Sequence, residues 1–171
     1  MRRRLAELYL KNKELILYLI FGVLTTFVGW AVYFVVLLCG KGAMGIPADQ
    51  TSGGKYLLVY TVAQVIQWVA AVLFAYFTNR KWVFTEADKN APVLSQLCVF
   101  AAGRLATFGL DYVVTFFGAM ALSSILPALS SVSMLGREWN LNEIGAKVAA
   151  AVIVIIGNYI FSKLVVFKKK G

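Results

Sequence analysis

Four long apolar runs dominate this sequence and limit it to a membrane-spanning fold. They extend from about Leu15 to Leu38, Tyr56 to Thr78, Leu94 to Leu122 and Ile144 to Val166. Each run is long enough to cross the ~30 Å hydrocarbon core of a bilayer as a helix that rises ~1.5 Å per residue. The chain is 60% hydrophobic with a mean hydropathy of +0.76, and this excess lies mainly in the four runs. The sequence therefore predicts an all-α integral membrane protein with four transmembrane helices.

The segment before the first span admits two interpretations. It begins Met-Arg-Arg-Arg, like a signal peptide, but the apolar run that follows starts late, is too long for a signal sequence and lacks a small-residue cleavage site. We therefore interpret this run as a retained span. Residues 1–14 mix basic and acidic residues with leucines, so they form either a short helix in the membrane interface or a frayed polar tail.

Basic residues mark one side of the predicted topology. The two tails and the loop between spans two and three hold most of the net charge of +9, whereas the other two loops have little net positive charge. The marked positions are Arg2, Arg3, Arg4, Lys11, Lys13, Arg80, Lys81, Lys89, Lys168, Lys169 and Lys170. By the positive-inside rule, this side faces the cytoplasm. We predict a multi-pass protein of the cytoplasmic (inner) membrane with both termini in the cytoplasm, and no nucleic-acid partner.

Several chemistries are disfavoured by residues that the sequence lacks. There is no histidine, no P-loop pattern and no Asp-x-Asp pair, so we predict no nucleophile–base constellation and no site for a nucleotide or a metal-bound sugar nucleotide. Cys39 and Cys98 are expected at opposite membrane faces, which argues against a disulfide, and their spacing fits no zinc site. We expect no cofactor, no metal ion and no enzymatic activity.

The two halves of the chain resemble each other. The start of span one, around Gly22, matches the start of span three, around Gly103, and the ending FTNRKWVF of span two resembles Phe161–Phe167 at the end of span four. Each half, about 15–84 and 94–167, is a hairpin entering from the cytoplasm, so the repeats are parallel rather than inverted. The sequence thus predicts a single membrane domain over residues 1–171, with a parallel duplication of a two-helix hairpin.

Three charged residues fall inside the predicted spans, where a charge at mid-membrane costs at least ~2.5–3.5 kcal/mol. Arg104 and Asp111 are seven residues apart and share a face of span three. Lys147 lies about one turn from the outer end of span four, at a depth similar to that of Asp111. One interpretation is a buried Asp111–Lys147 ion pair that fixes how the two spans dock. In the other, Arg104 and Lys147 line a polar groove and bind an anion, since the planar arginine fork suits phosphate.

Polar residues extend this pattern along the spans. One face of span four carries Lys147, Asn158 and Ser162, while Gln64 and Gln67 share a face of span two. Such residues are common helix-packing contacts, but together with the cations they favour an enclosed polar path. The cytoplasmic ends of spans two and four are expected to form a basic, aromatic mouth that attracts lipid phosphates. Its residues are Asn79, Arg80, Lys81, Trp82, Phe84, Ser162 and Lys163.

From about Leu17 to Phe167, the chain resembles the GtrA-like proteins of cell-surface polysaccharide and teichoic-acid glycosylation. The resemblance rests on the four-span layout, on Gly22 and on the span-two ending NRKWVF. The polar and aromatic positions of the family pattern fall on Asn79, Arg80, Phe84, Arg104, Lys147 and Asn158. The second ending departs from the pattern, with Ser162-Lys163-Leu164 where a further basic or aromatic residue would be expected.

The resemblance implies translocation of a polyprenyl-phosphate-linked monosaccharide across the cytoplasmic membrane, beside a synthase that loads the carrier and a transferase that uses the sugar outside. Arg104 and Lys147 would neutralise the phosphate, Asn79 and Asn158 would contact the sugar, and Arg80 would join this substrate-binding set. The alternative is a non-transporting membrane subunit that anchors or activates a glycosyltransferase. A third hypothesis is a small multidrug exporter, for which Asp111 is the only candidate proton carrier. Four transmembrane helices are few to enclose a path for a substrate, which is compatible with a homo-oligomer.

Overall fold

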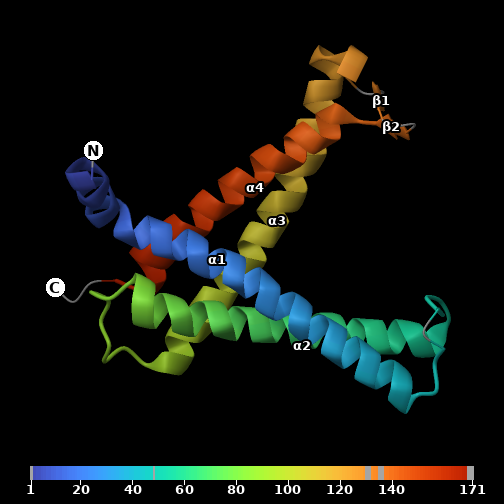
Figure 1. Cartoon of the computed structure of the whole chain (residues 1–171), viewed down its shortest axis with the longest axis horizontal. Helices are drawn as coiled ribbons and strands as arrows, with labels where there is room; N and C mark the ends of the chain where they lie inside the picture. The colour runs from blue at the N-terminus through green and yellow to red at the C-terminus, as the bar shows by residue number, and fades with distance from the viewer. Residues whose placement is uncertain (1, 48, 130–131, 135–136, 169–171) are drawn as a thin grey trace. The chain divides into compact units, whose positions relative to one another are not determined.

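Four long helices make up most of the computed structural model (Figure 1), which describes residues 2–47, 49–129, 132–134 and 137–168. The helices are α1 (Arg2–Ala43), α2 (Gly54–Thr78), α3 (Val93–Ile125) and α4 (Leu141–Phe161). Each contains a stretch long and apolar enough to cross a membrane. The predicted all-α membrane fold with four transmembrane helices is therefore confirmed.

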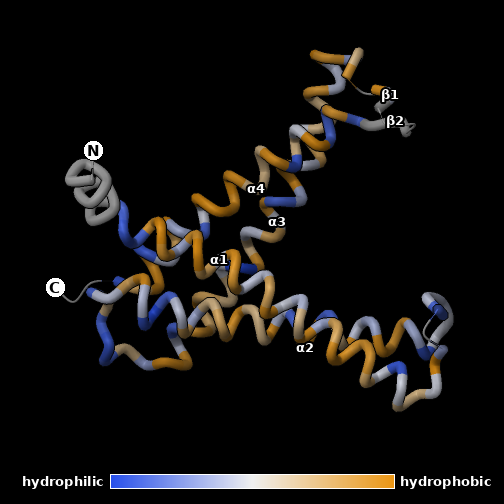
Figure 2. The backbone as a smooth tube through the Cα atoms, in the orientation of Figure 1, coloured by the Kyte–Doolittle hydropathy of each residue, from blue (hydrophilic) through white to orange (hydrophobic). Residues whose placement is uncertain are grey.

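The chain divides into two compact units, with the boundary between Ala87 and Asp88. We call the unit built on α1 and α2 hairpin one, and the unit built on α3 and α4 hairpin two. Figure 2 shows that hydrophobic residues dominate the helices of both. Many large apolar side chains are exposed, such as Leu38 at 65% and Phe108 at 72%. Exposed apolar surface on this scale is what a lipid-facing helix requires.

Small residues let the two helices of each hairpin approach closely, as in other membrane helix pairs. In hairpin one, a Cβ added to Gly40 would collide with the side chain of Val59. In hairpin two, a Cβ on Gly103 would collide with the ring of Phe161, and one on Gly118 would lie 3.3 Å from the Cβ of Ala146. These positions fix the antiparallel register of the helices that they join.

The start of α4 is set by two asparagines. The side chain of Asn140 accepts hydrogen bonds from the backbone N–H groups of Asn142 and Glu143, both 3.1 Å long, and so caps the helix. Asn142, which is buried, donates its side-chain N–H to the carbonyl of Leu126 at 2.9 Å and ties this end of α4 to the end of α3. The loop between them holds the 3-10 turn η2 (Pro127–Leu129) and a short antiparallel pair, β1 (Val132–Met134) with β2 (Arg137–Trp139).

Both hairpins end in a five-residue π-helix, which the sequence did not predict. The first, η1 (Asn79–Val83), continues α2, and the second, η3 (Ser162–Val166), continues α4. Each is closed by a phenylalanine whose backbone N–H bonds back five residues at 2.8 Å, from Phe84 to Asn79 and from Phe167 to Ser162. A π-helix is rare, and it occurs frequently at functional sites.

The closing phenylalanines make equivalent contacts in the two hairpins. The ring of Phe84 packs on Tyr18 with centroids 6.4 Å apart, and the ring of Phe167 packs on Phe100 at 6.0 Å. Tyr18 and Phe100 are 82 residues apart in the chain, which pairs Gly22 with Arg104 instead of with Gly103. The contacts favour this alignment, shifted by one residue from the expected one, and the duplication itself stays a prediction.

The N-terminal segment is helical in the backbone from Arg2 onward. Non-helical dihedrals at Asn12 (φ −111°, ψ 15°) mark a kink between this segment and the membrane span Asn12–Ala43. A helix, rather than a frayed tail, therefore precedes the span, and its position in the membrane interface stays a prediction. The side chains of Arg2, Arg3, Arg4 and Lys11, together with Lys169 and Lys170, lie outside the described residues.

Candidate functional site

Arg104 lies on α3 of hairpin two, partly buried, with its guanidinium 5.0 Å from the ring centroid of Phe100. The glycine before it packs against α4, and three residues further along Thr107 donates a hydrogen bond to the side-chain oxygen of Asn158 at 3.0 Å. These contacts hold α3 and α4 together at this level of the hairpin. The guanidinium of Arg104 therefore belongs to a transmembrane helix and lies against an aromatic ring. Such a cation–π contact stabilises a charge that is partly removed from water.

The two asparagines expected to contact a sugar are buried within their own hairpins. Asn158 is 5% exposed and accepts the hydrogen bond of Thr107, so its amide serves the contact between α3 and α4. Asn79 is 2% exposed and opens the π-helix η1. The Asn158 amide thus already has a partner on α3, Asn79 lies buried at the start of η1, and contact of either with a sugar stays a prediction.

Asp111 and Lys147 form a salt bridge 2.5 Å long between α3 and α4. It differs from the buried pair expected, because the lysine side chain is 59% exposed and the aspartate 23%. Since Gly118 lies beside Ala146 and the helices are antiparallel, the backbone of Lys147 is about six residues from the level of Asp111. At ~1.5 Å per residue this separation is about 9 Å, so the lysine side chain has to reach along the helix to meet Asp111, a difference in depth that the sequence did not indicate.

This salt bridge lies in a groove of about 930 Å³ on hairpin two. The groove is lined by Glu143 and by the hydroxyls of Ser123, Ser124 and Thr115, with aromatic rings along α3. The hydroxyl oxygen of Thr115 is buried and has no hydrogen-bond partner among the described residues. The groove therefore combines an ion pair with polar groups able to bind a hydroxyl-bearing ligand.

The ion pair gives a first testable prediction. Asp111→Asn leaves the lysine charge in the span without its carboxylate, and Lys147→Gln does the reverse, so each single change should destabilise the folded protein. The double variant should be more stable than the sum of the single effects predicts, by on the order of 1 kcal/mol. Thermal unfolding of the four proteins in one detergent measures this coupling, and strictly additive effects would show that the contact contributes nothing.

At the end of each hairpin, a cation is bonded to a tyrosine four residues before it. Arg80 donates to the hydroxyl of Tyr76 at 2.8 Å, and Lys163 donates to that of Tyr159 at 3.2 Å. Both cations remain partly exposed. The tyrosines were not identified from the sequence, although the i, i+4 spacing with a basic residue in each repeat was a usable signal.

Of the other residues expected at the cytoplasmic mouth, only two are exposed. Lys81 lies over the ring of Trp82 at 4.8 Å, and Trp82 stacks on Phe21 with centroids 5.3 Å apart and an interplanar angle of 8°. Phe84 and Ser162 are instead buried, at 3% and 2% exposure, because they close or open a π-helix.

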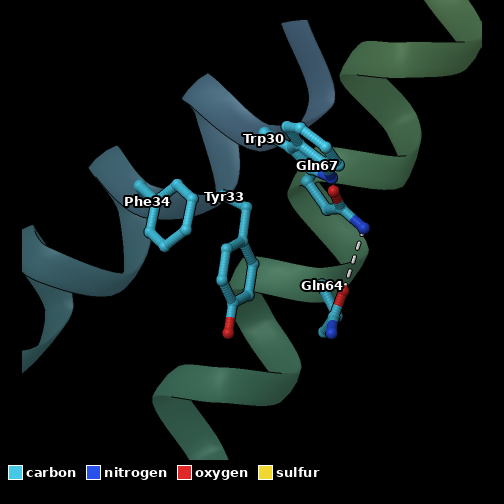
Figure 3. A pocket seen from close by; sticks show the side chains of 5 residues that line it. All are labelled: Trp30, Tyr33, Phe34, Gln64 and Gln67. Atoms are coloured by element: carbon cyan, nitrogen blue, oxygen red, sulfur yellow. Dashed lines mark hydrogen bonds between the residues drawn. The ribbon is translucent and has the colours of Figure 1, made fainter. Parts of the chain in front are cut away.

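Hairpin one holds a pocket of about 500 Å³ that lies outside the predicted site (Figure 3). It is lined by Trp30, Tyr33 and Phe34 of α1 and by Gln64 and Gln67 of α2. The sequence identified the two glutamines as part of a polar stripe. It did not identify Trp30 and Phe34 as their neighbours, because the register between α1 and α2 is not visible in the sequence.

Four apolar helices and charged residues within the spans define a multi-pass membrane protein with polar groups at membrane depth. Residues 17–167 match the GtrA/DPMS transmembrane-domain family, and the chain belongs to this family. The expected GtrA-like resemblance is therefore confirmed.

Curated relatives point to the same family. The cell wall teichoic acid glycosylation protein GtcA of Listeria monocytogenes is 34% identical over 111 residues, which cover 65% of this chain and 66% of that protein. GtcA of Listeria innocua is 37% identical over 109 residues, 64% of each chain. The uncharacterized membrane protein YwcD of Bacillus subtilis is 28% identical over 154 residues, 90% of this chain and 95% of its own length. For the two GtcA proteins, the aligned residues span less than two thirds of the length of each relative. No solved structure matches the chain.

Proposed function

We propose that this protein translocates a polyprenyl-phosphate-linked monosaccharide across the cytoplasmic membrane, for glycosylation of a cell-surface polymer such as teichoic acid. The observation that carries the proposal is the presence of two cations, Arg104 and Lys147, within the membrane-spanning helices of a GtrA/DPMS-family protein. The GtcA relatives, which are named as cell wall teichoic acid glycosylation proteins, support a role in glycosylation.

The physical problem in such transport is the phosphate-sugar head, not the lipid tail. The tail can stay in the bilayer, whereas a phosphate inside hydrocarbon is strongly unfavourable unless a partner neutralises it. An arginine offers two parallel N–H bonds to a phosphate, and a lysine offers a mobile point charge. Arg104 and Lys147 can supply these two kinds of contact from α3 and α4.

The salt bridge between Lys147 and Asp111 gives the lysine a partner when no substrate is bound. A lipid phosphate that reaches the groove of hairpin two would compete with Asp111 for the lysine, because both are oxyanions. The half-exposed lysine can exchange partners without unpacking the helices. In this account, Asp111 keeps the cation satisfied in the resting state, rather than carrying protons as the exporter hypothesis would require.

The ends of the hairpins fit the first encounter with substrate. With both termini in the cytoplasm, Arg80 and Lys163 would lie near the inner-leaflet headgroups, where basic side chains attract lipid phosphates. Their tyrosine partners hold the cations close to the π-helices. We expect these residues to affect capture of the lipid more than its passage across the membrane.

The test is reconstitution of the purified protein into vesicles that contain a polyprenyl-phosphate glucose. Periodate does not cross the bilayer and oxidises the diols of exposed sugars, so it reports the fraction of sugar in the outer leaflet over time. The proposal predicts that nearly all sugar becomes accessible with wild-type protein, and only the outer-leaflet share with Lys147→Ala. Lys147→Arg should retain part of the activity.

Accessible sugar limited to the outer-leaflet share with folded wild-type protein would contradict the proposal. That result would favour the alternative of a membrane subunit that anchors or activates a glycosyltransferase. Addition of the cognate transferase would then be the informative next step, because only the subunit hypothesis predicts a rise in transferase activity without lipid movement.

A further inference from the structure

We infer that the pocket of hairpin one binds the uncharged sugar ring of the lipid-linked substrate. The pocket is formed by Trp30, Tyr33 and Phe34 on α1 and by Gln64 and Gln67 on α2, as Figure 3 shows. The inference rests on the proposed function and adds to it a substrate class, a neutral hexose, and a location for its recognition. The volume of the pocket, about 500 Å³, lies within the range of about 300–1,000 Å³ that small-molecule sites occupy.

The amides of the pocket form a short hydrogen-bonded chain. Gln67 donates to the side-chain oxygen of Gln64 at 2.9 Å, and Gln64 donates to the hydroxyl of Tyr60 at 2.8 Å. Figure 3 shows the first of these bonds as a dashed line between the two glutamines. The chain orients both amides, as a preorganised site requires.

These bonds leave further hydrogen-bonding capacity on the same groups. A glutamine amide has two N–H donors and one carbonyl oxygen, and the chain uses one N–H of each glutamine and the carbonyl of Gln64. The second N–H groups and the carbonyl of Gln67 can therefore serve a ligand. A sugar hydroxyl both donates and accepts, so it can satisfy an amide carbonyl and an amide N–H, whereas the ionised phosphodiester of the same lipid only accepts.

The aromatic residues supply the other half of a carbohydrate site. Sugars have an apolar face of C–H groups, which packs well on aromatic rings, and a ligand pocket typically combines such rings with a few oriented polar groups. Tyr33 is held by an edge-to-face contact with Tyr60, whose ring centroid is 6.2 Å away. The same tyrosine, Tyr60, thus positions a ring on α1 and ends the amide chain on α2.

The pocket has no formal charge among its lining residues, in contrast to the groove of hairpin two. Trp30 and Phe34 lie 82 residues before Tyr112 and Phe116 of that groove, and Gln64 lies 83 residues before Lys147. Similar offsets relate Tyr18 to Phe100 and Phe84 to Phe167. Equivalent positions of the two hairpins thus carry an amide in one and a cation in the other. The pocket of hairpin one, with its neutral lining, therefore suits an uncharged group such as a sugar ring.

The experiment compares three lipids that share the same carrier and phosphate. Binding of polyprenyl-phosphate glucose, polyprenyl-phosphate glucuronate and bare polyprenyl phosphate to the full chain in nanodiscs is measured by competition. Wild-type protein should bind the glucose lipid about tenfold more tightly than the other two. Gln67→Leu, which removes an amide, and Tyr33→Leu, which removes a ring, should each abolish most of this preference and leave the affinity for bare polyprenyl phosphate unchanged.

Matched controls separate recognition from folding. Trp30→Phe alters the pocket, whereas Trp68→Phe alters a tryptophan on α2 that does not line it, so only the first should reduce the preference for glucose. Tyr33→Leu leaves the amide chain of Gln64 and Gln67 in place and serves if Gln67→Leu does not fold, whereas Tyr33→Phe keeps the ring and should retain the preference.

The outcomes distinguish the inference from the proposed function. Equal binding of all three lipids by wild-type protein, or a full preference for glucose in the folded Gln67→Leu and Tyr33→Leu variants, would overturn the sugar pocket while the phosphate-lipid function stands. No binding of any of the three lipids would contradict both.

Discussion

Replacing Arg104 by alanine is expected to lower the rate of lipid-linked sugar transport by about 100-fold. A charge-assisted, bidentate contact with a phosphate in a poorly hydrated site contributes on the order of 3 kcal/mol when one partner is removed, which corresponds to this factor. The residue lies within the span of α3 and stacks on Phe100, so the hairpin already holds the guanidinium in place. The measurement is the initial rate of periodate accessibility in vesicles with equal amounts of folded protein.

Two controls decide whether Arg104 acts on the substrate or on the fold. Arg104→Lys keeps the charge but not the planar fork, and should transport at an intermediate rate. Arg104→Gln keeps much of the side-chain length and its packing on Phe100 but has no charge, so it should be as slow as the alanine variant. If Arg104→Gln transports at the wild-type rate, the arginine contributes packing and not phosphate binding.

Gly103→Ala should destabilise hairpin two by about 1–3 kcal/mol, the usual cost of an overpacked contact. The added methyl would lie well inside contact distance of the Phe161 ring, so either the ring or the helices must move. Loss of this close approach would also shift the hydrogen bond between Thr107 and Asn158, which lies one turn further along α3. Thermal unfolding in detergent measures the effect.

Gly109→Ala on the same helix is the matched control. A Cβ at this position meets nothing within 4 Å, so the only expected effect is the gain in helix propensity, up to about 1 kcal/mol. The two substitutions are chemically identical and should act with opposite signs. Equal melting temperatures for the two variants would contradict the packing of α3 on α4 described for Gly103 and Phe161.

The transmembrane helices could be predicted from the sequence because hydrophobicity along a span is a local property. The predicted end of the second span at Thr78 coincides with the end of α2. The π-helices could not be predicted, since they depend on a local shift of backbone bonds to partners five residues back, such as Phe84 to Asn79 and Phe167 to Ser162, that no composition signal reports.

The candidate site was only partly visible in the sequence. The pairing of Asp111 with Lys147 follows from opposite charges in neighbouring spans, and the structure places the two in contact. The burial of Asn79 and Asn158 depends on how each helix packs in its hairpin, and an amide can either bond a neighbouring helix or bind a ligand. The pocket around Gln64 and Gln67 depends on the register between α1 and α2, so Trp30 and Phe34 were not predicted to line it.

The most direct test of the central claim is the transport assay on wild-type protein alone, with no other protein in the vesicles. The account predicts that polyprenyl-phosphate glucose sealed in the inner leaflet becomes accessible to periodate far faster than in protein-free vesicles, without ATP or an imposed ion gradient. Accessibility that stays at the level of protein-free vesicles, with protein shown to be folded and inserted, would contradict the claim that this chain is itself the translocase.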